Sequence, residues 1–238
     1  MIMTVADMHE QFLHWYDKQS NFSAPEVTPE EIDIYLNNAQ YQFLKIITEK
    51  GLEKSQEWLD YTKNITSSYS TTPVASSNKP NGWYVTLPLG TLNGLPNQMI
   101  YRLALLEEVS VTFTDCGVSK TARIPVIPMT RDEYNKVVAN PFKKPWKEEI
   151  IRLTVDNNRF EIIGFTGATL NTYYLDYIRE PQRIQYGSQY SAPIANQNCE
   201  LESKAATKII EIAVELAFKT VSDPRLSLEQ LENLVKTI

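Results

Sequence analysis

Apolar residues recur at steps of three and four along the start of the chain, the spacing that places side chains on one face of an α-helix. We therefore expect a first helix over Met3–Tyr16. Its apolar face consists of Val5, Met8, Phe12, Leu13 and one of the pair Trp15 and Tyr16. An amphipathic helix cannot bury this face alone, so it needs a partner elsewhere in the chain.

A second helix begins at a capping signal. Thr28 can cap it, Pro29 suits the first helical position, and Glu31 completes a capping box. Gly51 is expected just past its end. The apolar face of this helix consists of Ile32, Tyr35, Leu36, Ala39, Phe43, Leu44 and Ile47. A shorter third helix is expected over residues 53–65.

Helical spacing returns from Glu200 onward. The apolar positions of this helix are Ala205, Ile209, Ile212, Ala213, Leu216 and Ala217. A last helix is expected over residues 226–238. Because helices open and close the chain, we expect residues 1–65 and 199–238 to form one helical bundle.

Residues 66–198 are expected to form a β domain with long loops. Ser, Thr, Asn and Pro dominate residues 66–82, and residues 182–198 are also polar, so both stretches are predicted to be irregular. Each holds little apolar surface, and we expect it to order only when subunits assemble. The predicted strands are "WYVTLP", "IYRLALLEEVSVTF", "ARIPVIP", "IIRLTV", "RFEIIGF" and "TLNTYYLDYI".

The connections between these strands set the expected fold class. They look too short for parallel crossovers, which favours an antiparallel sheet, and the prolines of "ARIPVIP" favour a sheet edge for that strand. A short helix is predicted over residues 130–139, with Thr130 as its cap and Glu133 three residues on. The expected fold is α+β, a terminal helical bundle with an antiparallel β-sheet or sandwich insert.

Composition narrows the class of protein. The chain has 238 residues, of which 42% are hydrophobic and 22% charged, as in globular proteins. Its net charge of −6 argues against a general nucleic-acid binder. We find no apolar segment long enough to span a bilayer and no export leader, which predicts a cytosolic product without membrane association. The two cysteines, Cys116 and Cys199, are expected to be free and buried.

The residues that usually carry catalysis do not form a recognisable pattern. His9 and His14 lie five residues apart on the first helix, about 140° around its axis, and are interpreted as surface residues. The acidic neighbours at 30–31, 107–108 and 148–149 point apart and are interpreted as solvated charges. There is no glycine-rich phosphate loop. We therefore expect no catalytic residue, no cofactor and no metal site.

Aromatic residues make up 11% of the chain, and many fall in predicted loops and edges. About half of these fit ordinary core packing, and the rest fit burial against other chains, because interfaces favour Tyr, Trp and Phe. In "NPFKKPW", residues 140–146, we expect Phe142 to face the core and Trp146 to lie nearer another subunit. The candidate interface residues are Trp83, Phe142, Lys143, Lys144, Trp146, Tyr173, Tyr186 and Tyr190.

Several segments resemble, in the same order, the head-to-tail connector (ring or tail-tubular) proteins of crAss-like phages, short-tailed viruses of gut bacteria. These segments are "MTVADMHEQFLHWYDKQSNFSAPEVTPEEIDIYLNNAQYQFLK", "NPFKKP", "YLDYIREP" and "CELESKAATKIIEIAVELAFKTVSDPR". The resemblance spans most of the chain but does not include the Ser/Thr-rich residues 66–82.

The resemblance implies a structural virion protein, made in the host bacterial cytoplasm. Such proteins form a homo-oligomeric ring, usually a dodecamer, beneath the portal at the phage neck. The resemblance further implies contacts with the portal protein and adjacent ring or tail proteins, and a channel for genome DNA without sequence-specific binding. Two other classes stay open: a virion-associated cell-wall hydrolase that uses two carboxylates, and a carbohydrate-binding module that stacks Tyr and Trp on sugar rings.

Overall fold

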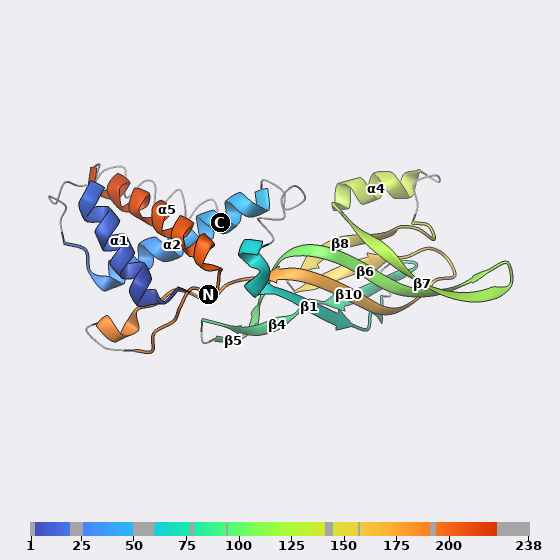
Figure 1. The fold of residues 1–238 in the computed structure, drawn as a ribbon. Coiled ribbons are helices and arrows are strands. Elements are labelled where there is room, and N and C mark those ends of the chain that lie inside the picture. The colour runs from blue at the N-terminus through green and yellow to red at the C-terminus, as the bar shows by residue number, and fades with distance from the viewer. Residues whose placement is uncertain are drawn as a thin grey trace. The chain divides into compact units, whose positions relative to one another are not determined.

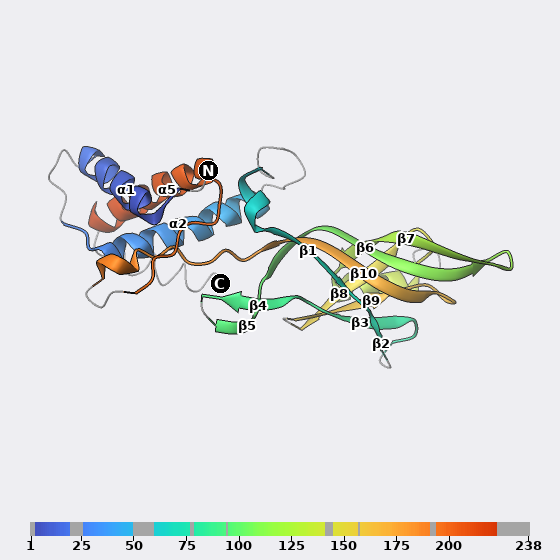
Figure 2. The ribbon, with the colours of Figure 1, turned by 60° about the horizontal axis from the view of Figure 1, so that its bottom comes forward.

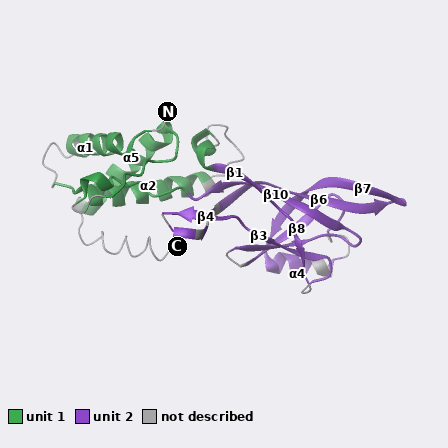
Figure 3. Ribbon diagram, turned by 90° about the horizontal axis from the view of Figure 1, so that it is seen from below, with its two compact units in different colours: residues 1–65, 181–238 green, residues 66–180 purple. Residues whose placement is uncertain are grey.

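The computed structural model describes residues 3–19, 26–49, 60–76, 79–93, 95–140, 145–156, 158–190 and 194–222. The chain divides into two compact units (Figure 3). Unit 1 comprises residues 1–65 and 181–238, and unit 2 comprises residues 66–180. Unit 1 is helical and unit 2 contains the strands, so the fold is α+β, as expected. Residues 181–198, which the sequence assigned to the β domain, cluster with the helices instead.

Among its described residues, unit 1 contains the helices α1 (Val5–Gln19), α2 (Pro29–Glu49) and α5 (Ser203–Ser222), which pack against one another (Figures 1 and 2). Short 3₁₀ turns, η2 (Lys63–Ile65) and η3 (Gly187–Gln189), complete it. The capping box predicted for α2 is present, because the Thr28 N–H donates to Glu31 Oε2 at 2.8 Å and the Glu31 N–H donates to Thr28 Oγ1 at 3.3 Å.

The buried faces of these helices differ in part from the predicted stripes. Ile212 and Leu216 are only half-buried, and Leu13 is exposed. The fully buried face of α5 contains Ala205, Ala206, Ile209, Ile210, Ala213, Val214 and Ala217. The face is wider than the sequence suggested because α5 contacts both α1 and α2. The last predicted helix, the end of α2 near Gly51 and most of the third helix lie outside the described residues.

In the part of the chain that the structure describes, unit 2 contains two sheets. The larger has eight strands in the order β1-β10-β6-β7-β8-β9-β3-β2, and β4 pairs with β5 in a separate two-stranded sheet. The strands are β1 (Thr66–Thr71), β2 (Val74–Ala75), β3 (Gly82–Thr86), β4 (Leu89–Leu92), β5 (Leu95–Met99), β6 (Tyr101–Asp115), β7 (Val118–Met129), β8 (Ile150–Asp156), β9 (Arg159–Ile163) and β10 (Thr169–Arg179).

The larger sheet must curl on itself. Its two edge strands, β1 and β2, are separated in the chain only by Thr72 and Pro73. In a flat sheet the edges of eight strands would lie about 34 Å apart, whereas so short a connection spans roughly 10 Å. The curl encloses a core formed by Val85, Leu87, Val109, Val111, Ile124, Val126, Ile150, Phe160, Ile162, Phe165, Leu170, Tyr173, Leu175 and Tyr177.

Three features of this sheet correct the sequence-based prediction. Residues 66–71 were predicted as an irregular loop but form β1, which pairs with β10 over its whole length within one chain. The "ARIPVIP" strand, β7, is interior and not an edge. It pairs with β6 up to Pro125 and with β8 from Val126 onward. Each half therefore has one described ladder partner, and its other side, where no ladder hydrogen bond is made, can accommodate proline.

The third correction is that the sheet is mixed. Strands β7 and β8 are parallel, because helix α4 (Arg131–Ala139) supplies the crossover between them. The predicted capping box of α4 is confirmed, with Thr130 and Glu133 bonded reciprocally. This helix covers the outer face of β8 and β9, where the buried apolar residues are Ile151, Leu153 and Ile163 and the half-buried ones are Met129, Tyr134 and Val137.

Candidate interaction surfaces

The long β6–β7 hairpin reaches beyond the other strands of unit 2 (Figures 1 and 2). Strand β10 follows β6 only to Thr112, and the hairpin turns at Cys116 and Gly117. Both turn residues have positive φ, 50° and 80°, as a type I′ hairpin turn requires. Cys116 is consequently exposed, whereas the sequence predicted a buried thiol; Cys199 is buried.

Trp146 is linked to this hairpin by the next residue, Lys147, which contacts the hairpin directly. Lys147 Nζ forms a short ion pair with Asp115 and lies 5.7 Å from the centroid of the Phe113 ring and 5.6 Å from that of Trp146. The Trp146 side chain is 64% exposed. Its backbone is fixed by two hydrogen bonds to Glu149, of 3.2 and 3.1 Å. A large, exposed aromatic ring on a hydrogen-bonded backbone is typical of an interface anchor.

Asp115 holds this cluster together electrostatically. It accepts a hydrogen bond of 2.8 Å from Lys120 in addition to the contact with Lys147. The hydrogen bond from Lys120, followed by that from Lys147, lowers the pKa of the Asp115 carboxyl from 3.8 to about 2. The carboxylate is therefore charged at any physiological pH, and both lysines are oriented by it.

Trp83 and Tyr173 belong to the interior of unit 2. The Trp83 ring is partly buried and packs against the core, where it lies against Gly164. Tyr173 is completely buried, and its hydroxyl donates to Glu107 at 3.0 Å. Tyr173 therefore has no surface to offer another chain in this conformation, unlike the expectation from sequence.

Glu107 itself was interpreted as a solvated charge but is buried inside the curled sheet. Its Oε1 lies 3.0 Å from Arg152 Nη1, and the Arg152 guanidinium stacks over the Phe160 ring at 4.1 Å. A β-bulge explains this placement, because Tyr177 pairs with Ala104 and Asp176 with Leu106, which leaves Leu105 as an extra residue.

The extra residue reverses which side chains face inward. Ala104 packs on the core before the bulge and Glu107 lies inside after it, while Leu106 is 51% exposed. Desolvation raises the pKa of Glu107, against the lowering effects of Arg152 and of the Tyr173 hydrogen bond. A simple alternation of residues in "LALLEEVSV" cannot show this.

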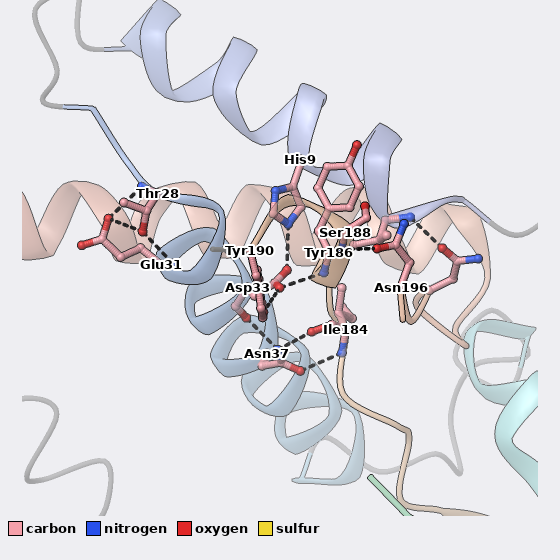
Figure 4. A network of polar contacts seen from close by, with 12 residues as sticks. His9, Thr28, Glu31, Asp33, Asn37, Ile184, Tyr186, Ser188, Tyr190 and Asn196 are labelled. Carbon is pink, nitrogen blue, oxygen red and sulfur yellow. Dashed lines mark hydrogen bonds and ion pairs between the residues drawn. The ribbon is translucent and has the colours of Figure 1, made fainter. Parts of the chain in front are cut away.

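Tyr186 and Tyr190 lie in unit 1, beside a buried carboxylate on α2 (Figure 4). Asp33 accepts hydrogen bonds from the Tyr186 N–H at 2.8 Å and, over a shorter distance, from the Tyr190 hydroxyl. His9 Nε2 lies 2.7 Å from its other oxygen. Burial, together with the bond to Asp33, raises the pKa of Tyr190 to about 12, so this hydroxyl stays a donor at neutral pH.

One turn further along α2, Asn37 continues the network. Its side-chain NH₂ donates to the Ile184 carbonyl at 2.8 Å, and its Oδ1 accepts from the Ile184 N–H at 2.9 Å. Together with Asp33, these bonds attach the irregular segment after residue 181 to α2 (Figure 4). His9 is thus buried, against the expectation of a surface histidine, while His14 is exposed.

Three predicted interface residues, Phe142, Lys143 and Lys144, lie outside the described residues. Within the described part of the chain, no three His, Cys, Asp or Glu side chains come together in a way that could hold a metal ion. No described helix is long and apolar enough to cross a membrane.

Comparison with known proteins gives matches along nearly the whole chain. The family model for phage tail ring protein 3/4 matches residues 3–225. Ring protein 3 of Bacteroides phage crAss001 is 24% identical over 210 residues, which cover 81% of this chain and 86% of the relative. Ring protein 4/5 of the same phage is 24% identical over 229 residues, which cover 90% and 92% respectively.

Proposed function

Because the chain belongs to the family of phage tail ring protein 3/4, we propose that it assembles as a structural ring of the virion neck, between the portal and the tail. The observation that carries this proposal is the extent of the match. Residues 3–225 include both compact units, and the two ring-protein relatives are also covered over most of their length. Both units therefore fall within the region that the ring protein family shares.

In the proposed ring, twelve copies surround the channel through which genome DNA passes. The helical unit contacts the portal or an adjacent ring, and unit 2 contacts neighbouring subunits and the next tail component. The net charge of −6 supports such a conduit, because an acidic subunit has little general attraction for DNA. The exposed Trp146 ring supports a contact with another chain at the β6–β7 hairpin.

The two other function classes have less support. A hydrolase that uses two carboxylates needs both near a substrate cleft, but the buried carboxylates of unit 2 are engaged: Glu107 pairs with Arg152 at 3.0 Å, and Glu161 pairs with Lys79 at 2.8 Å. A sugar-binding module needs a platform of exposed rings, but Trp83 and Tyr173 pack on the core and Tyr190 is bonded to Asp33.

The test is the mass of the native assembly. The purified protein, alone and mixed with its portal protein, is measured by native mass spectrometry and imaged by electron microscopy. The proposal expects a closed ring of about twelve times the mass of one chain, or a complex with the portal in the same ratio. A protein that stays monomeric in both preparations would contradict it.

A further inference from the structure

An uncharged stretch covers both edges of the larger sheet. Between Asn64 and Tyr101 the chain carries a single charged residue, Lys79, although 22% of all its residues are charged. This stretch contains β1 and β2, the two edge strands of the eight-stranded sheet, and also the separate β4–β5 hairpin. The cores of protein interfaces are depleted of charge in the same way.

The edge at β1 lacks the features that usually prevent strand addition. Natural edge strands carry lysines, prolines or bulges that stop another strand from pairing. Strand β1 is six residues long, pairs with β10 without a register shift and contains neither charge nor proline. Among the described strands, no ladder joins β1 to β2 or β3, although β1 leads into β2 after two residues. The pairings make β1 and β2 run in the same direction, so together they form one continuous run that pairs first with β10 and then with β3. The seam is the side of β1 that faces away from β10, where no described strand forms a ladder.

The β4–β5 hairpin is not part of a larger sheet. Among the described strands, β4 and β5 pair only with each other. An isolated two-stranded hairpin is marginally stable in water and needs further strands or an apolar support. Two leucines of this hairpin are exposed, Leu89 at 45% and Leu95 at 61%. Val74 on β2, just beyond the end of β1, is also an exposed apolar residue, at 67%.

We propose that the seam of one subunit takes up the β4–β5 hairpin of a second copy of this chain, which adds to the edge of β1. The strand of the hairpin that fits is β4, which has four residues and no proline, against six residues in β1; β5 carries Pro96, and β2 has only two residues. Both surfaces are uncharged, so pairing desolvates no charge. Main-chain hydrogen bonds to an exposed sheet edge are a known mode of strand addition.

This inference rests on the proposed ring function, since it names the contact through which the ring closes. Seam and hairpin are different surfaces of the same subunit, so the contact is heterologous and repeats from each copy to the next. A second copy is the partner that this chemistry fits, because every copy carries both halves of the contact in a fixed ratio of one to one.

The experiment blocks each half separately. Leu95→Glu places a charge on the hairpin, and a double variant, Ser68→Lys with Ser70→Lys, places charges along β1 as natural edge strands do. All three side chains are exposed, so the subunit should fold normally, which circular dichroism checks. Each variant alone is expected to lose the ring and remain monomeric. An equal mixture is expected to form dimers and nothing larger, because it retains one intact contact per pair.

A matched control is Leu106→Glu, the same substitution at an exposed leucine on β6, which should leave the ring intact. If the wild-type protein forms rings and the blocked variants do so equally, or if their mixture forms no dimers, the edge contact is wrong while the ring function stands. A wild-type protein that is monomeric alone and with its portal overturns both. If Leu95→Glu fails to fold, Leu89→Glu replaces it as the hairpin variant.

Discussion

His9 on α1 and Asp33 on α2 form a buried contact of 2.7 Å between Nε2 and Oδ1, and the same carboxylate holds the segment that carries Tyr186 and Tyr190. Three parts of the chain that are distant in sequence therefore meet at one side chain of α2. The segment after residue 181 has little regular structure of its own, and Asp33 gives it a fixed position on the helices of unit 1.

The first prediction concerns this carboxylate. Asp33→Ala leaves a histidine, a backbone N–H and a hydroxyl without their acceptor, so the free energy of unfolding should fall by about 3–5 kcal/mol. Tyr190→Phe removes one bond to a charged group and should cost about 1.5–3 kcal/mol. Glu10→Ala, at an exposed position of α1, is the control and should change stability by less than about 0.5 kcal/mol. Chemical denaturation measures all three, and an Asp33 variant as stable as the control would contradict the network.

The second prediction concerns the ion pair inside the curled sheet. Glu107→Ala leaves the Arg152 guanidinium buried without its carboxylate and should cost about 3–5 kcal/mol. The double variant Glu107→Met with Arg152→Met removes both charges and should lose clearly less stability, about 1–3 kcal/mol, because only the bond from the Tyr173 hydroxyl to Glu107 is then missing. Denaturant titration of the two variants tests this. Equal losses in the single and double variants would mean that packing volume, and not the unpaired charge, decides the effect.

The third prediction is a pH dependence at the hairpin end. The Asp115 pKa is lowered to about 2, so its interactions with the two lysines stabilise the folded state above pH 3.8 and are lost as the pH falls toward 2. An NMR titration of the Asp115 carboxyl should show this low pKa in the wild type. Lys120→Ala and Lys147→Ala should each move it back toward 3.8. Lys136→Ala on α4 is the control, and an unchanged pKa in both lysine variants would disprove the assignment.

The fourth prediction compares two isoleucines of α5. Ile209 is fully buried and Ile212 is half-buried, so the same truncation should have different costs. Ile209→Ala should lower the free energy of unfolding by about 2–5 kcal/mol, as expected for a core cavity. Ile212→Ala should cost clearly less, because less apolar surface is lost from the core. Thermal or denaturant unfolding of the pair decides between this face and the one predicted from sequence periodicity.

Signals that act over a few residues could be predicted from the sequence. The capping boxes at Thr28 and Thr130 and the strands "IIRLTV" and "RFEIIGF" are all present as predicted. Caps, turns and alternation depend on atoms close together in the chain, so a short window contains the whole cause. The resemblance to ring proteins of crAss-like phages is likewise confirmed, because it depends only on the order of residues.

The tertiary structure decided every feature that needs a distant partner. Residues 66–71 form a strand only because β10, about 100 residues later, offers a ladder, and the crossover through α4 makes β7 and β8 parallel. The bulge at Leu105 places Leu106 outside and Glu107 inside the sheet. There the Glu107 carboxylate pairs with Arg152 and accepts a hydrogen bond from Tyr173. A buried polar side chain is stable only where it has a hydrogen-bond or ion-pair partner, and the sequence does not show which partners the fold brings together.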